Sequence, residues 1–147
     1  MRQAEQVRYL VLAVQRAGNR RLAAELLPLE LTPAQAEILR ILGDHTGLTV
    51  NGVGEMLVCD SGINPSRLVD RLVRAGLVER TSDADDRRRV RLALTTEGLR
   101  VEGEVRLIED AMYSEIDTLP GVAQLVGTLT SLVAGQPAGE ALKRRIG

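Results

Sequence analysis

The sequence has 147 residues, of which 44% are hydrophobic and 27% are charged, with a formal net charge of −1. This length suffices for one domain with its own core. The near-neutral charge excludes a protein that binds nucleic acid over its whole surface. Because Tyr9 and Tyr113 are the only aromatic residues, the core must be built from aliphatic side chains, which favours helices.

Three helices are predicted in the first part of the chain, and their expected ranges are 3–27, 32–42 and 49–57. Apolar residues recur at helical spacing in the first range, and Pro28 ends that stretch. Thr32 is a suitable cap for the second helix, because Pro33 follows at the first helical position and Gln35 completes a capping box. Thr49 is the expected cap of the short third helix.

A tight turn at 59–62 leads into an amphipathic helix that is expected to run to Arg74. Two starts are open for this helix. Ser61 is one candidate cap, and Asn64, which is followed by a proline, is the other. Gly76 is placed to terminate the helix. A short helix, a tight turn and a second helix form the unit that lays a recognition helix in the DNA major groove.

A basic hairpin follows the recognition helix. Its strands are predicted at 77–81 and 89–94, and a polar loop at 82–88 joins them. Between residues 61 and 95, eight arginines outnumber five acidic residues, which leaves a local charge of +3. A basic hairpin beside a groove-reading helix defines a winged helix-turn-helix. We therefore predict a mainly α fold with a small β-hairpin wing, in which residues 32–96 form the DNA-binding lobe.

Two more helices are predicted after the hairpin, the first capped by Thr95 or Thr96. The terminal ranges 3–31 and 97–134 carry continuous apolar stripes that a compact winged-helix lobe does not need. We therefore expect some of this surface to be buried between the subunits of a homodimer. Residues 135–147 are expected to form a frayed tail of the single domain.

The residues that we predict to contact DNA are polar or basic and lie on the recognition helix, in the turn before it, or on the wing: Ser61, Asn64, Ser66, Arg67, Arg71, Arg74, Arg87, Arg88 and Arg89. Arginine favours guanine and asparagine favours adenine, and Asn64, Ser66 and Arg67 lie nearest the helix start, where base edges are in reach. An arginine-rich face is more often an ordinary solvated surface, and only the helix-turn-helix context favours DNA. Adjacent side chains of a hairpin point in opposite directions, so we expect one or two wing arginines to reach phosphate or a narrowed minor groove. Asp70 is expected to pair with a nearby arginine.

At this point the chain resembles the MarR family of bacterial winged-helix regulators over residues 5–134. The resemblance rests on segments that occur in family order: LTPAQ at 31–35, LTV at 48–50, SRLVDRL at 66–72, GLVER at 76–80, DRR with a valine at 86–90, and LTTEG at 94–98. The chain departs from the usual family pattern at 62–65, where Gly-Ile-Asn-Pro replaces small polar residues at the opening of the recognition helix.

The resemblance implies a dimer whose N- and C-terminal helices interlock, and whose two winged-helix lobes read a palindromic site. It also implies repression that is relieved by a small ligand or by oxidation. In the wing, it implies a motif formed by Asp86 and Arg88. Arg88 is then the better candidate for DNA contact, and Asp86 is expected to orient an arginine in a wing salt bridge.

Several single residues have two interpretations. Tyr9 and Tyr113 are candidates for the pocket of a small aromatic or other apolar effector, and core packing is equally open. Cys59 lies in the turn before the recognition helix, where oxidation would disturb DNA binding, but a buried, unreactive thiol is the favoured interpretation. His45 is the only histidine, so we predict no metal site and no cofactor. With no disulfide, signal-peptide or membrane-span pattern, we expect a cytoplasmic protein without a membrane partner.

An enzyme is not expected, because the sequence lacks a glycine-rich phosphate loop, paired metal-ligand spacing and a nucleophile near a histidine. We predict a homodimeric transcriptional regulator that binds double-stranded DNA, most simply a repressor of a palindromic operator that a small effector releases. Two alternatives stay open: a redox-responsive regulator that acts through Cys59, and a winged-helix module that binds protein instead of DNA. The sequence does not separate a repressor from an activator.

Overall fold

The computed structural model describes residues 1–147, which form two compact units, 1–33 and 34–147. The first unit consists of the long helix α1 (Gln3–Leu26) and the 3-10 turn η1 (Leu27–Leu29). The apolar residues of α1 are largely exposed along its length, including Val7, Leu10, Val11 and Val14. This helix therefore presents an apolar surface.

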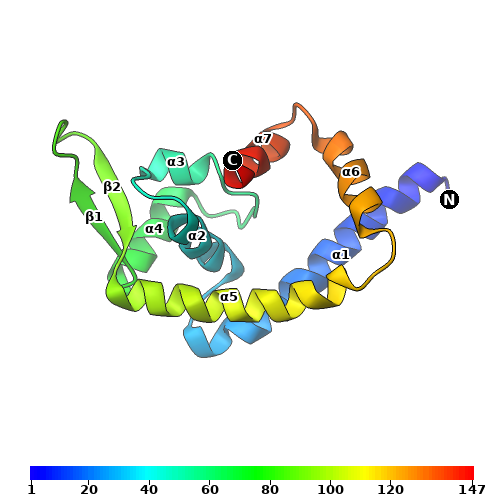
Figure 1. Ribbon diagram of the computed structural model, residues 1–147, viewed down its shortest axis with the longest axis horizontal. Coiled ribbons are helices and arrows are strands. Elements are labelled where there is room, and N and C mark those ends of the chain that lie inside the picture. The colour runs from blue at the N-terminus through cyan, green and yellow to red at the C-terminus, as the bar shows by residue number, and fades with distance from the viewer. The chain divides into compact units, whose positions relative to one another are not determined.

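The second unit contains six helices and one hairpin (Figure 1), with the order α2 (Pro33–Asp44), α3 (Val50–Gly54), α4 (Pro65–Arg74), β1 (Val78–Ser82), β2 (Val90–Leu94), α5 (Thr96–Asp117), α6 (Val122–Val133) and α7 (Pro137–Ile146). The predicted fold class, mainly α with a small β-hairpin wing, is confirmed. The cap expected at Thr49 is present, because its side chain accepts a hydrogen bond from the N–H of Gly52. Of the two candidates for the cap of α5, Thr95 and not Thr96 takes that role, and its side chain accepts from the N–H of Gly98.

The core of this unit is aliphatic, as the composition requires. It is formed by buried side chains of α2, α4, the hairpin and the first half of α5: Ile38, Leu39, Ile41, Leu68, Val69, Leu72, Val78, Leu92, Val101 and Val105. Burying a side chain of this size contributes about 1.5–3 kcal/mol. The apolar stripe of α4 is thus fixed against the core, and its polar face is turned to solvent.

The wing is a two-stranded antiparallel hairpin in which Val78 pairs with Leu94 and Ser82 pairs with Val90. The N–H of Leu92 also donates to the carbonyl of Leu48 at 2.8 Å, so the segment before α3 adds one further backbone hydrogen bond beside β2. Figure 1 shows the hairpin at the N-terminal end of α5 and the helix α6 at its C-terminal end. α5 therefore connects the wing to the C-terminal helices.

α5 is buried only in its first half, where Val101, Glu102 and Val105 pack into the lobe. Its second half is mostly exposed, and α6 has no buried residue. No single helix is long and apolar enough to cross a membrane. α5 and α6 pass that criterion only when they are taken as a pair, which is bent by 107° at the break between them.

The prediction of a frayed tail at 135–147 is wrong, because residues 137–146 form the helix α7. Gly139 and Ala141 are buried in the second unit. A Cβ on Gly139 would lie 2.1 Å from the carbonyl oxygen of Val133, so only glycine permits this approach of α7 to the end of α6. Small residues at close contacts carry little hydrophobic signal, and for this reason the sequence did not indicate a packed helix.

Candidate nucleic-acid interface

The recognition helix α4 begins at Asn64, which settles the choice between its two possible caps. The Asn64 Oδ1 atom accepts a hydrogen bond from the N–H of Arg67 at 2.9 Å, and Pro65 takes the first helical position. Ser61 lies in the preceding turn, where its hydroxyl accepts a hydrogen bond from the N–H of Ile63 at 3.3 Å. The start of α4 is therefore defined by the same residues that depart from the usual family pattern.

The polar face of α4 carries free cations. Arg67, Arg71 and Arg74 are exposed and make no ion pair within the chain, and Ser66 is exposed beside them. Asp70 forms an ion pair with Arg80 of β1, as predicted for this residue. Because Asp70 is engaged, its charge is balanced locally and the three arginines of α4 remain available.

The tip of the wing is ordered by two aspartates with different roles. Asp83 accepts from the guanidinium of Arg91 at 3.0 Å, and the N–H of Asp85 and the charge of Arg91 together hold the pKa of Asp83 below its usual value. Asp86 accepts instead from the backbone N–H of Arg88 at 2.9 Å. The wing salt bridge expected at Asp86 is thus found at Asp83. Strand pairing places Arg91 opposite Thr81, and Asp83 lies two residues further along the chain, just after β1, within diagonal reach of the Arg91 side chain.

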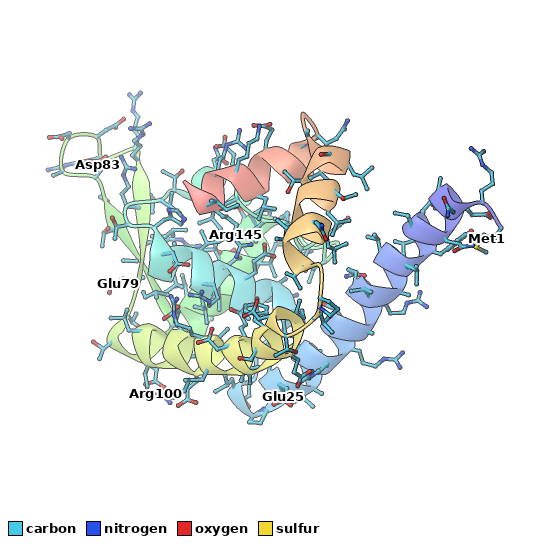
Figure 2. The ribbon with its side chains drawn as sticks, turned by 45° about the vertical axis from the view of Figure 1, so that its right-hand side comes forward. Met1, Glu25, Glu79, Asp83, Arg100 and Arg145 are labelled. Atoms are coloured by element: carbon cyan, nitrogen blue, oxygen red, sulfur yellow. The ribbon has the colours of Figure 1, made fainter.

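The arginines at the wing tip, Arg87, Arg88 and Arg89, are all exposed and unpaired. Figure 2 shows Asp83 at the far end of the hairpin, where the loop that carries these arginines begins. Together with those of α4, six exposed arginines have no acidic partner. These arginines are available to bind anionic phosphates, because no carboxylate of the chain neutralises their charge.

A hollow of about 480 Å³ separates α3 from the start of α4, and it is lined by Val50, Asn51, Gly54, Glu55, Asn64, Pro65 and Ser66. Asn51 is exposed in the first turn of α3 and shares this hollow with two of the predicted contact residues. Asn51 was not among the predicted contact residues, because these were sought only on the recognition helix, in the turn before it and on the wing.

An ion-pair network joins the winged-helix lobe to the far part of α5. Arg40 of α2 donates to Glu102 at 2.6 Å and to Glu109 at 2.8 Å, and its side chain is only 15% exposed. Burial opposes the charge of Arg40, but the hydrogen bonds to the two glutamates outweigh it and raise the pKa of Arg40. Arg106 extends the network by bonding to Asp44 at 2.9 Å and to Glu102 at 2.7 Å.

The remaining candidates are Cys59, Tyr9 and Tyr113. Cys59 is half-buried, and burial, followed by the charges of Glu37 and Asp60, raises the pKa of its thiol. Tyr9 is exposed in the first unit, and the guanidinium carbon of Arg8 lies over its ring at 5.1 Å from the ring centre. Tyr113 is half-exposed in the second unit, and its partial burial raises the pKa of its hydroxyl. No group of three or more acidic, histidine or cysteine side chains is placed to hold a metal ion.

A capped helix anchored by an apolar stripe, preceded by a short helix and followed by an arginine-bearing hairpin, defines the class of winged helix-turn-helix proteins. Residues 31–90 match the model of the MarR family. The transcriptional regulator TtmR of Methylorubrum extorquens is 35% identical over 101 residues, which cover 68% of this chain and 51% of the relative. The organic hydroperoxide resistance transcriptional regulator of Bacillus subtilis is 32% identical over 99 residues, covering 67% of this chain and 66% of the relative. The match thus spans about half to two thirds of these relatives, which are regulators and not enzymes.

Solved structures of similar proteins match this chain over nearly its whole length. Apo MarR of E. coli is 30% identical with a TM-score of 0.63, and the match covers 86% of this chain and 93% of that one. MepR of S. aureus in complex with DNA is 26% identical with a TM-score of 0.78, covering 87% and 96%. CouR of Rhodococcus jostii bound to p-coumaroyl-CoA is 27% identical with a TM-score of 0.75, covering 90% and 95%. This chain belongs to the MarR family.

Proposed function

We propose that this chain is a transcriptional regulator that binds double-stranded DNA as a homodimer and represses from a palindromic operator. The observation that carries the proposal is the recognition helix, whose apolar side is locked into the core while Arg67, Arg71 and Arg74 stay exposed and unpaired. The solved complex of the similar MepR with DNA supports the same use of the fold. An enzyme is not proposed, since the named relatives are regulators.

In this proposal residues 32–96 form the DNA-binding lobe, and the contacts divide into two groups. Ser66 and Arg67 in the first turn of α4 reach base edges, together with the amide nitrogen of Asn64, whose oxygen is already used in the cap. The other proposed residues, which are Ser61, Arg71, Arg74, Arg87, Arg88 and Arg89, position the protein on phosphates or enter the minor groove with the wing. Asn51 joins this group through the hollow that it shares with Ser66.

Dimerisation is assigned to the apolar surfaces of residues 3–31 and 97–134. α6 has no charged residue, and its Leu125, Val126, Leu129 and Leu132 are between 37% and 60% exposed. An apolar surface of this kind on a helix marks a protein interface. A twofold dimer would place two recognition helices about 34–36 Å apart, on successive major grooves of one DNA face.

We further propose that a small aromatic or other apolar effector controls DNA affinity, with Tyr9 and Tyr113 as candidate pocket residues. The similar CouR is known with p-coumaroyl-CoA bound. An effector acts only if it binds one dimer arrangement more tightly than the other. Redox control through Cys59 is less favoured, because its raised pKa keeps the thiol protonated and unreactive at neutral pH.

The test is a titration of the purified protein against the DNA upstream of its own gene, with a shuffled fragment of equal length as the control. Sedimentation of the complex gives the number of chains per DNA. We expect saturable binding of two chains, with at least about a thousandfold preference for the natural fragment, within the range of specific binders. Equal binding to both fragments, at several upstream regions, would support a winged helix that contacts protein instead.

A further inference from the structure

The turn before the recognition helix is held by a buried carboxylate. Glu37 of α2 is only 9% exposed. Its Oε1 accepts a hydrogen bond from the N–H of Val58 at 2.8 Å, and its Oε2 accepts from the N–H of Cys59 at 2.9 Å. These two amides belong to the irregular segment between α3 and α4, where neither a helix nor a strand supplies backbone partners. Glu37 therefore replaces regular secondary structure as the acceptor that fixes this turn.

A cation from the other end of the sequence reaches the same carboxylate. Arg145 of α7 donates to Glu37 Oε1 at 2.6 Å, with side-chain exposures of 29% and 10%. Figure 2 shows Arg145 on the side of α7 that faces α2. α7 is also fastened to α3, because Arg144 donates to the carbonyl of Glu55 at 3.3 Å. The C-terminal helix thus completes a charge pair inside the helix-turn-helix unit.

Removing one partner of a buried charge pair leaves the other uncompensated, which costs far more than the pair itself contributes. Without Arg145, the carboxylate of Glu37 is left in a poorly solvated site without the cation that balances it. The uncompensated carboxylate gains by turning toward water, away from the two amides. This movement loosens the turn at Val58 and Cys59, and with it the placement of the helix start at Asn64. Base readout depends on that placement, because its hydrogen bonds tolerate little displacement.

We propose that Glu37 and Arg145 are positioning residues for DNA recognition, and that α7 sets DNA affinity by clamping the turn before α4 through this pair. Neither residue needs to touch DNA in this role. The inference rests on the proposed DNA-binding function, and it adds to that function a control point in the C-terminal helix.

The test measures operator affinity for Glu37→Gln, Arg145→Ala and Arg145→Lys, with Lys143→Ala as the matched control. Lys143 is a cation of the same helix that pairs only with Glu140 of α7. The probe is the DNA fragment that the wild-type protein saturates, and circular dichroism checks that each variant is folded at the assay temperature. We expect Arg145→Ala to weaken binding by about tenfold, within the range for a charged hydrogen bond. Arg145→Lys should recover most of that loss, and Lys143→Ala should change binding by less than about twofold.

Two results distinguish a positioning role of this ion pair from a simple effect of its charges on DNA affinity. Glu37→Gln removes a negative charge, which by charge alone would tighten DNA binding, whereas loss of the clamp weakens it. Arg145→Ala should leave the dependence of log affinity on log salt unchanged, because no phosphate contact is lost. A salt slope reduced by about one would instead mark Arg145 as a direct phosphate contact and overturn the proposal. Unchanged affinity for both variants would overturn it as well.

Amide exchange tests the clamp without DNA. Hydrogen exchange at the N–H groups of Val58 and Cys59 should accelerate in Arg145→Ala and stay unchanged in Lys143→Ala. If the wild-type protein binds no DNA, the proposed function fails, and this exchange measurement then decides on the clamp alone. Unchanged protection of both amides in Arg145→Ala would show that α7 does not hold the turn.

Discussion

The junction between the wing and α5 has a glycine at a position where any side chain would clash with the backbone. A Cβ on Gly98 would lie 1.9 Å from the carbonyl oxygen of Leu77, which itself accepts a hydrogen bond from the N–H of Thr95 at 3.1 Å. Carbon and oxygen approach to about 3.3 Å, so Gly98→Ala has to open this junction by more than about 1 Å. Gly103 lies five residues further along α5, and a Cβ added there would have no other atom within 4 Å.

We predict opposite effects for alanine at the two sites. Overpacking costs about 1–3 kcal/mol and the bond from Thr95 contributes about 1 kcal/mol, while alanine returns up to about 1 kcal/mol of helix propensity. Gly98→Ala should therefore lower the free energy of unfolding by about 2 kcal/mol, or the Tm by about 4–8 °C. Gly103→Ala should raise the free energy of unfolding by about 0.5–1 kcal/mol. Urea and thermal unfolding at one protein concentration measure both. Equal stability of the two variants would refute the close approach of α5 to the backbone of Leu77.

Three further predictions concern the ionisable groups. Arg40→Met should lower the free energy of unfolding by about 1–3 kcal/mol, because it removes the ion-pair partner of the part-buried Glu109 and one of the two arginines bonded to Glu102. Lys143→Met, at an exposed site, is the control for denaturant unfolding. The hydrogen bond from Arg106 lowers the pKa of Asp44 from its ordinary value of 3.8. The charged Asp44 therefore stabilises the folded protein above about that pH, and this stabilisation is lost as the pH falls through the lowered pKa. Asp44→Asn should reduce the loss of stability at acid pH, and an unchanged loss would contradict this prediction. The raised pKa of Cys59 predicts slower alkylation by iodoacetamide at pH 7.5 than for free cysteine, whereas an equal or faster rate would reopen the redox alternative.

Local signals in the sequence predicted most of the elements. Thr49 and Thr95 cap the helices that they were expected to cap, and the strands of the wing lie within one residue of the predicted ranges. These features depend on a few neighbouring residues, so spacing and residue type suffice. The start of α4 needed the structure, because Ser61 and Asn64 both offer a suitable side-chain oxygen and only the backbone path selects Asn64.

Interactions between distant residues could not be predicted in this way. Glu37 is a single acidic residue in an apolar helix, and its partner Arg145 lies 108 residues further along the chain. The pairing of Asp83 with Arg91 follows from the register of the hairpin, which the tip sequence does not define. The helix α7 was missed because its packing depends on Gly139 and Ala141, whose small side chains give no amphipathic pattern.

The most direct test of the account is the salt dependence of operator binding by the wild-type protein and by Arg88→Ala. Arg100→Ala serves as the control, since Arg100 is exposed but paired with Glu97. If the wing contacts phosphate, Arg88→Ala should weaken binding and reduce the slope of log affinity against log salt by about one. Arg100→Ala should leave the slope unchanged. Wild-type slopes near zero, or equal slopes for all three proteins, would contradict a DNA interface built from the unpaired arginines of α4 and the wing.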